Sequence, residues 1–264
     1  MYHSITFGEK NTWDDWHLVP SSRPVFLPPE QKVMEIDIPG GDGVINMSET
    51  LTGYPIYNNR KGSIEFIVMY GDGYGSWVNR YSEIMDYLHG RTKRAILKDD
   101  DPFYFYEGRF FVSSWVSNPD GTGSRITIDY DLAPYKLALQ SSTEDWLWDP
   151  FSFETGIIQD VFGGIEIDSD DWVEYDFTKM IGRKPVVPKF IVTVTEGTTI
   201  DAQLYVRDLS INWRERHMTT GTHTFYDYVM VELYETNANA ANPTVKMKFK
   251  GHGVISIDFR RGGL

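Results

Sequence analysis

Residues 11–18 read Asn11-Thr12-Trp13-Asp14-Asp15-Trp16-His17-Leu18, and they belong to a series of short blocks that decides the fold of this chain. The other blocks, in sequence order, are Phe7-Gly8, Ser22-Arg23-Pro24, Ile38-Pro39-Gly40-Gly41-Asp42-Gly43, Leu51-Thr52-Gly53 and Tyr57-Asn58-Asn59-Arg60. None of them has the residue types and spacing of a catalytic or metal-binding motif. Their information therefore lies in their order along the chain.

This order of blocks resembles the N-terminal domain of siphophage distal tail proteins, the Dit family. The resemblance runs from residue 5 to residue 137, and Pro134-Tyr135-Lys136 matches the point where that domain ends. Asn46 departs from the family, whose members carry Asp soon after the glycine-rich turn, and this affects only a local contact. The resemblance implies a mainly β fold, with an N-terminal β-sandwich or split-barrel domain that contains one α-helix, followed by a galectin-like jelly-roll β-sandwich. The expected domains are residues 1–138 and 139–264.

The resemblance also implies a structural function in the virion, at the distal end of the phage tail, for a protein made in the host cytoplasm. Six copies would form a ring between the tail tube protein and the tail-tip protein, and the second domain would hold receptor-binding proteins. DNA would pass through the ring without specific binding. We expect no enzyme activity, no cofactor, and no catalytic, cofactor-binding or metal-binding residues. The alternative function is a carbohydrate-binding module or adhesin that acts directly on the host cell wall.

Composition supports a large β core and argues against anionic partners. The 264 residues include 8 Trp, 16 Tyr and 15 Phe, and aromatic side chains favour strands and interfaces. The net charge is -13 and the acidic residues are spread over both halves, so the chain should repel nucleic acid and anionic membrane surfaces. The absence of cysteine excludes disulfides and thiolate chemistry. No segment has the apolar length of a membrane span or the pattern of a signal peptide.

Local patterns in the first domain predict strands and one helix. Apolar residues recur at helical spacing from Trp77 to Leu88, with Ser76 as the N-cap and Gly90 in the left-handed position after the helix. Glu107-Gly108 has the character of a two-residue hairpin turn between strands at 103–106 and 109–112. A further turn at 118–123 precedes the alternating strand 125–130. The basic residues Arg91, Lys93 and Arg94 are expected at a solvated helix end, with a binding patch as the other interpretation.

The proline-rich segment from Pro20 to Glu35 should run extended, because its four prolines disfavour both helix and ladder hydrogen bonds. It is either a surface loop or an arm that reaches a neighbouring subunit. Beyond the boundary, the sequence predicts strands at 164–167, 189–195, 202–206, 224–228, 245–249 and 253–261.

No residue or motif in the sequence gives a strong signal for catalysis, metal binding or sugar binding. Asp14 and Asp15 lie between two tryptophans, where burial would raise a carboxyl pKa, but the simpler interpretation is a stabilised turn. Asp99-Asp100-Asp101 is expected in a solvated turn, and Asp168-Ser169-Asp170-Asp171 lacks the remaining ligands of a calcium loop. The six histidines are not at metal-ligand spacing, and Gly71, Gly73 and Gly75 do not form a dinucleotide loop. Trp146, Trp148, Trp172 and Trp213 are candidates for stacking on sugars, although burial in the sandwich is the commoner arrangement.

Overall fold

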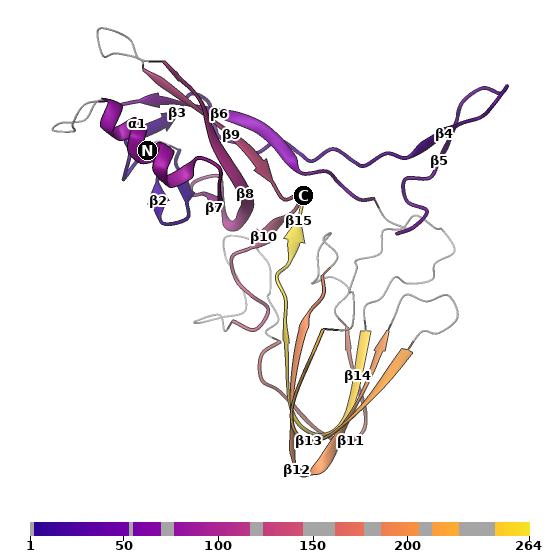
Figure 1. Ribbon diagram of the computed structural model, residues 1–264. Coiled ribbons are helices and arrows are strands. Elements are labelled where there is room, and N and C mark those ends of the chain that lie inside the picture. Colours follow the sequence, from indigo (N-terminus) through magenta and orange to yellow (C-terminus); the bar gives the residue numbers. More distant parts are fainter. Residues whose placement is uncertain are drawn as a thin grey trace. The chain divides into compact units, whose positions relative to one another are not determined.

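The computed structural model describes residues 3–52, 55–69, 77–116, 124–144, 162–176, 186–205, 213–226 and 246–264. The chain divides into two compact units, residues 1–137 with Leu264, and residues 138–263. Strands dominate both units, so the predicted mainly β fold is confirmed (Figure 1). None of the described helices is long and apolar enough to cross a membrane.

The first unit is built on a curled antiparallel sheet with the strand order β2-β1-β7-β8-β9-β6-β3. The bounds are β1 (Ile5–Phe7), β2 (Lys10–Asn11), β3 (Leu18–Pro20), β6 (Arg60–Val68), β7 (Arg91–Leu97), β8 (Asp101–Val116) and β9 (Arg125–Leu132). The expected alternation is clear in β9, where Ile126, Ile128, Tyr130 and Leu132 are buried between more exposed neighbours. These side chains face one hydrophobic core. The short strand β10 (Lys136–Ala138) also pairs with β8.

The hairpin predicted at Glu107-Gly108 is wrong, because β8 continues through both residues. Gly108 pairs with Lys93 of β7 on one side and with Leu132 of β9 on the other. A Cβ atom at Gly108 would collide with the backbone carbonyl of Asp131. This glycine therefore allows close approach of two strands and does not form a turn.

Helix α1 (Trp77–Leu88) packs against β8 and β7, and it confirms the predicted helix (Figure 1). Ile84 and Leu88 are fully buried, and Tyr81 and Met85 pack on the same core. Gly90 has φ of 72°, the left-handed conformation expected after the last turn. Arg91, Lys93 and Arg94 follow the helix as the first residues of β7, and Arg91 and Arg94 are exposed, so these positions are solvated as expected but belong to a strand.

Replacement of Leu88 by alanine should lower the free energy of unfolding by about 2–5 kcal/mol, because it leaves a cavity in the core under α1. The matched control is Val78→Ala on the same helix, where the side chain is 54% exposed. That variant should stay within about 0.5 kcal/mol of the parent. Urea unfolding followed by circular dichroism measures both, and equal effects would contradict the buried face.

The second unit contains a four-stranded antiparallel sheet with the order β11-β14-β12-β13. The bounds are β11 (Ile165–Asp176), β12 (Lys189–Tyr205), β13 (Trp213–Phe225) and β14 (Lys246–Asp258). The remaining strand is β15 (Gly262–Gly263). The strands bend near their middle, where the pairing register shifts (Figure 1). Both halves of β12, from Val192 to Ala202, contribute side chains to one hydrophobic core.

Two pairs of predicted strands are continuous strands in this sheet. Residues 189–195 and 202–205 are both in β12, and residues 246–249 and 253–258 are both in β14. Gly251 lies at the bend with φ of 118°, and a Cβ atom there would collide with the Thr199 carbonyl oxygen. Gly251 therefore allows the strand to bend and does not separate two strands.

Candidate assembly interface

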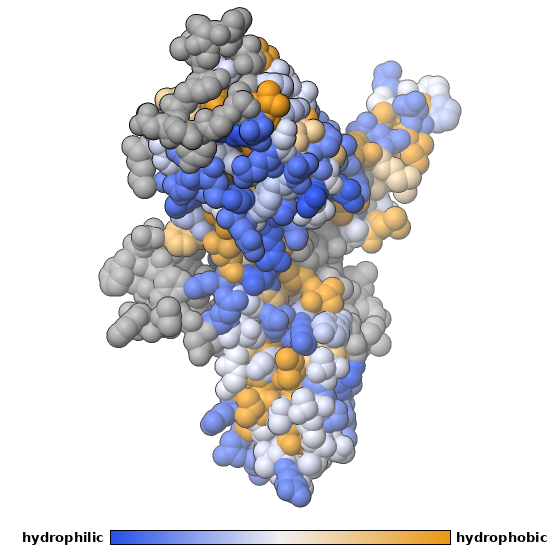
Figure 2. Space-filling model, turned by 60° about the vertical axis from the view of Figure 1, so that its left-hand side comes forward, coloured by the Kyte–Doolittle hydropathy of each residue, from blue (hydrophilic) through white to orange (hydrophobic). Residues whose placement is uncertain are grey.

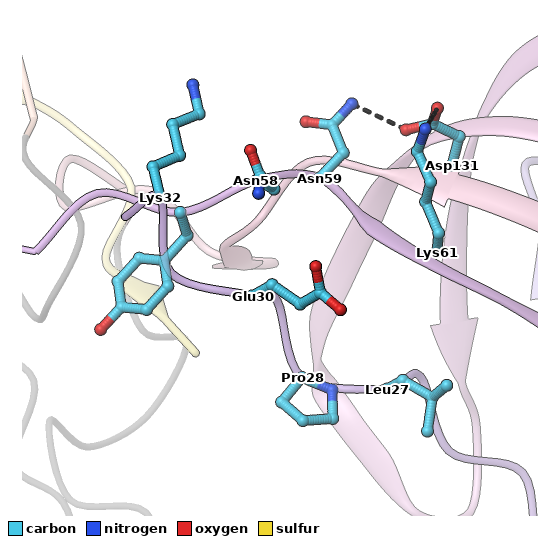
Figure 3. A pocket seen from close by; sticks show the side chains of 9 residues that line it. Leu27, Pro28, Glu30, Lys32, Asn58, Asn59, Lys61 and Asp131 are labelled. Carbon is cyan, nitrogen blue, oxygen red and sulfur yellow. Dashed lines mark hydrogen bonds and ion pairs between the residues drawn. The ribbon is translucent and has the colours of Figure 1, made fainter. Parts of the chain in front are cut away.

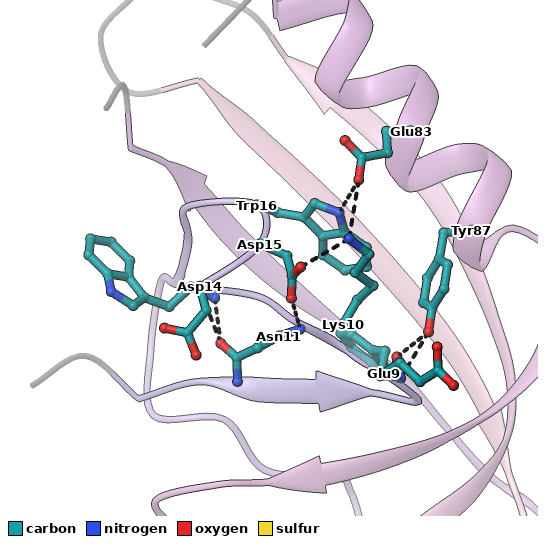
Figure 4. A network of polar contacts seen from close by, with 10 residues as sticks. Glu9, Lys10, Asn11, Asp14, Asp15, Trp16, Glu83 and Tyr87 are labelled. Carbon is teal, nitrogen blue, oxygen red and sulfur yellow. Dashed lines mark hydrogen bonds and ion pairs between the residues drawn. The ribbon is translucent and has the colours of Figure 1, made fainter. Parts of the chain in front are cut away.

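The block at residues 11–15 forms a turn held by its own side chains (Figure 4). The Asn11 side-chain carbonyl accepts hydrogen bonds from the backbone N–H groups of Trp13 and Asp14, at 2.8 and 3.2 Å. The Asp15 carboxylate accepts the Asn11 N–H at 2.7 Å and the Lys10 ammonium at 3.0 Å. Burial alone would raise the pKa of Asp15, but the Asn11 hydrogen bond and Lys10 outweigh it and hold this pKa below its usual value. The predicted turn is confirmed.

Trp16 joins this turn to helix α1. Its ring is fully buried, stacks on Phe7 and meets Tyr87 edge-on, and its Nε1–H donates to Glu83 at 3.3 Å. The Tyr87 hydroxyl donates to the Phe7 carbonyl at 2.9 Å. Gly8 has φ of 62°, and a Cβ atom there would lie 2.8 Å from that hydroxyl oxygen. The blocks Phe7-Gly8 and Asp14-Asp15-Trp16 are therefore parts of one packed contact.

The acidic run at 99–101 differs from the expected solvated turn. The Asp100 side chain is only 8% exposed and contacts both His3 and Arg23. Asp99 accepts the Ser4 backbone N–H at 3.1 Å. The run therefore fastens the N-terminal segment, and it holds the block Ser22-Arg23-Pro24 at the edge of the sheet. Sequence reasoning missed this because the partners of Asp100 are more than 70 residues away.

After Pro24 the chain runs over one end of the hydrophobic core of the first unit, which we call the first core. Phe26 is buried against the rings of Tyr106 and Tyr130. Arg60 is 3% exposed and donates to the carbonyl oxygens of Leu27 at 3.0 Å and Pro134 at 2.8 Å. Burial lowers the pKa of this guanidinium. Arg60 thus fixes the point at which the chain leaves the sheet.

Beyond this point, residues 31–49 form a projecting hairpin that we call the arm (Figure 1). Its strands are β4 (Glu35–Asp37) and β5 (Val44–Asn46), which pair only with each other among the described strands. Among the described residues, nine of the eighteen exposed large hydrophobic side chains lie between residues 25 and 51. They include Val33, Met34, Ile36, Ile38, Val44 and Ile45. Figure 2 shows hydrophobic surface on the projecting arm. The sequence predicted an extended segment up to Glu35 but missed this hairpin.

A pocket of about 550 Å³, which we call the root pocket, lies where the arm joins the sheet (Figure 3). It is lined by Leu27, Pro28, Glu30, Lys32, Tyr57, Asn58, Asn59, Lys61 and Asp131. Asp131 accepts a hydrogen bond from Asn59 at 2.7 Å and lies 3.5 Å from the Lys61 ammonium. Within the described chain, the Lys32 ammonium has no such ion pair.

The second unit exposes one of the candidate tryptophans. Trp172 is 36% exposed, and the Lys250 ammonium lies 5.0 Å from its ring centroid. The Asp201 carboxylate lies 3.4 Å from the Lys250 ammonium and 2.5 Å from the His217 ring nitrogen, so Lys250, Asp201 and His217 form a row of polar side chains.

Several residues that the sequence analysis named lie outside the described residues. They are Trp146, Trp148, the side chain of Trp213, the glycines at 71–75 and the cap residue Ser76.

The remaining candidates do not converge on a catalytic or metal site within the described ranges. Asp14 is exposed and lies 3.6 Å from Lys98. Asp168 and Asp170 both approach His252, inside β11 and β14 and not in a calcium loop. Among the described residues, no group of three His, Asp or Glu side chains could hold a metal ion.

No family model and no curated protein matches the chain. Among solved structures it is similar to the crystal structure of the SPP1 Dit protein, described as a paradigm of the hub adsorption apparatus in phages that infect Gram-positive bacteria. The similarity covers 100% of both chains, with a TM-score of 0.60 and 14% sequence identity. The chain has the Dit fold. A second match, to the phage p2 baseplate in its activated conformation, has a TM-score of 0.33 and 8% identity over 97% of this chain and 90% of the other.

The Dit fold confirms, at the level of architecture, the resemblance noted in the order of the N-terminal blocks. It also extends that likeness beyond residue 137 into the second unit, where the sequence offered only strands and spacing. In the first unit, the feature that sequence reasoning could have found is the arm. Two β-branched runs at 36–38 and 44–45 flank Pro39-Gly40-Gly41-Asp42-Gly43, which is a hairpin pattern.

Proposed function

We propose that this protein is a structural subunit of a siphophage tail, and that six copies form a ring between the tail tube and the tail tip. The observation that carries the proposal is the Dit fold over the whole chain, since the SPP1 protein of this fold is described as part of a hub adsorption apparatus. Residues 1–138 would form the ring, and residues 139–264 would project from it to hold receptor-binding proteins. The ring partners would be the tail tube protein and the tail-tip protein.

The arm supports a role in assembly. Exposed apolar side chains gathered on one projecting element are typical of a surface that another protein covers. The four prolines of the preceding segment preset an extended backbone, and Arg23 and Phe26 hold that segment on the first unit at the base of the arm. Residues 20–27 of this segment pack on their own unit through Arg23 and Phe26, so the part that we propose to lie across a neighbouring subunit is the arm, residues 31–49. We propose no enzymatic reaction and no specific binding of DNA, which would pass through the ring.

The mass of the purified full-length protein in solution tests this function. Light scattering should give six times the 30.4 kDa of one chain, because head-to-tail contacts that close produce one discrete size. The mass should be unchanged on dilution through the micromolar range. A strict monomer at these concentrations would count against the ring.

The second candidate is a carbohydrate-binding module of the host wall, favoured by the exposed ring of Trp172 beside the row Lys250, Asp201 and His217. An aromatic face with adjacent polar groups suits a sugar ring. This function needs no ring. Binding to host wall polysaccharide that is lost in Trp172→Ala, together with a monomeric mass, would favour it over the tail ring.

A further inference from the structure

The arm has the properties of a surface that is covered in the working protein. Ile36 and Ile45 face each other across the hairpin and are 45% and 53% exposed. Both strands have a free edge among the described strands, and a two-stranded hairpin alone is marginally stable in water. Stable monomers avoid this combination of open edges and apolar side chains.

The tip of the arm is small and polar, which suits insertion into a pocket. It reads Pro39-Gly40-Gly41-Asp42-Gly43, and Gly40 and Gly43 have φ of 73° and 84°. Among the described residues, no atom beyond the immediate chain neighbours lies within 4 Å of a Cβ built at either position, so both glycines face open space. Glycines let a backbone approach another surface closely. Among the described residues, the Asp42 carboxylate has no ion pair.

The root pocket has the complementary features. Its volume of about 550 Å³ can take a short glycine-rich turn, and the side-chain amides of Asn58 and Asn59 line it beside the Lys32 ammonium, which has no ion pair among the described residues. The tip cannot fill the pocket of its own chain. About eight extended residues, or about 25 Å, separate Lys32 from Gly40, and the arm points away from its root (Figure 1).

We propose that the tip of the arm of one copy seats in the root pocket of a second copy, with Asp42 against Lys32. This rests on the proposed ring and names the surface that receives each arm. Tip and pocket are different surfaces of one chain, so the contact is head-to-tail and can propagate around a closed ring. The apolar sides of the arm then lie against the neighbour on the way to its pocket.

Because the chain has no cysteine, a pair of introduced cysteines can test this contact by disulfide formation without competition from native thiols. Full-length protein carrying Asp42→Cys with Asn58→Cys is first checked for mass by light scattering and then oxidised. Interchain disulfides should give a ladder up to six chains on a non-reducing gel. A disulfide needs Cα atoms within about 7 Å, which excludes a bond within one chain. The control pairs Asp42→Cys with Ser82→Cys on the exposed face of α1, and it should give no ladder.

The outcomes separate this inference from the ring itself. A six-fold mass without a ladder, or an equal ladder in the control pair, overturns the tip-to-pocket contact and leaves the ring. A monomeric parent protein overturns both. Charge reversal gives an independent readout, because Lys32→Glu or Asp42→Lys alone should raise the concentration for half-assembly at least about tenfold. The double reversal should restore assembly, and failure to restore it counts against this pairing.

Discussion

Replacement of Trp16 by alanine is expected to lower the free energy of unfolding by about 3–5 kcal/mol. The ring is fully buried and packs on Phe7 and Tyr87, so its removal leaves a large cavity between the N-terminal turn and α1. It also removes the indole donor to Glu83. Urea unfolding followed by far-UV circular dichroism measures the loss without depending on tryptophan fluorescence.

Trp13→Ala is the matched control, because Trp13 lies three residues away and is only half-buried. It should cost clearly less than Trp16→Ala. If Trp16→Ala lowers the free energy of unfolding by less than about 1 kcal/mol, Trp16 is not packed in the core, because removal of a well-packed aromatic ring costs more than this. It would also remove the physical basis for treating the N-terminal blocks as one packed contact.

The sequence was informative where local pattern and tertiary packing agree. The alternation in β9 and the helical spacing of Ile84 and Leu88 both place apolar side chains on one face, and each face meets a core. Gly90 ends α1 because only a residue without Cβ takes the left-handed conformation at little cost. In these elements the residues nearby in the chain are enough to set the conformation.

The sequence misled where a residue serves a distant contact. Glu107-Gly108 has the composition of a turn, yet its glycine is needed because the Asp131 backbone passes too close for a side chain. Gly251 interrupts a strand pattern because β14 bends over a core that its own halves share with β12. The burial of Asp100 depends on Arg23, which no local pattern could reveal. Such positions need the fold before their chemistry can be interpreted.

The candidate assembly interface was also predictable only in part, because local sequence sets some of its features and distant contacts set the others. The proline-rich segment pointed to an extended surface element, but its prolines end at residue 29 and the hairpin follows. The apolar residues of the arm would be expected in a core by composition alone. Their exposure appears only in the folded chain, because β4 and β5 find no third strand among the described residues.

Deletion of the arm between Glu35 and Asn46, closed by a short glycine-serine linker, should abolish the ring without unfolding the protein. The arm contributes no buried side chain to the first core, so the unfolding transition should be nearly unchanged. Assembly should fail, because each docked apolar side chain contributes about 1.5–3 kcal/mol by leaving water. Loss of several of them should raise the concentration for half-assembly by at least about 1000-fold.

Light scattering measures the mass of the deletion variant. A second variant with a smaller expected effect carries the double substitution Ile36→Thr with Ile45→Thr. This pair keeps the hairpin and its β-branched side chains but removes apolar surface, so it should weaken the ring by less than the deletion. A six-fold mass for the deletion variant would show that the arm is not an assembly element.

Each subunit of a head-to-tail ring gives one arm and receives one, so a subunit without an arm can still accept the arm of its neighbour. Mixing it with intact protein should therefore yield open chains in place of closed rings, an effect that simple destabilisation of the subunit would not produce.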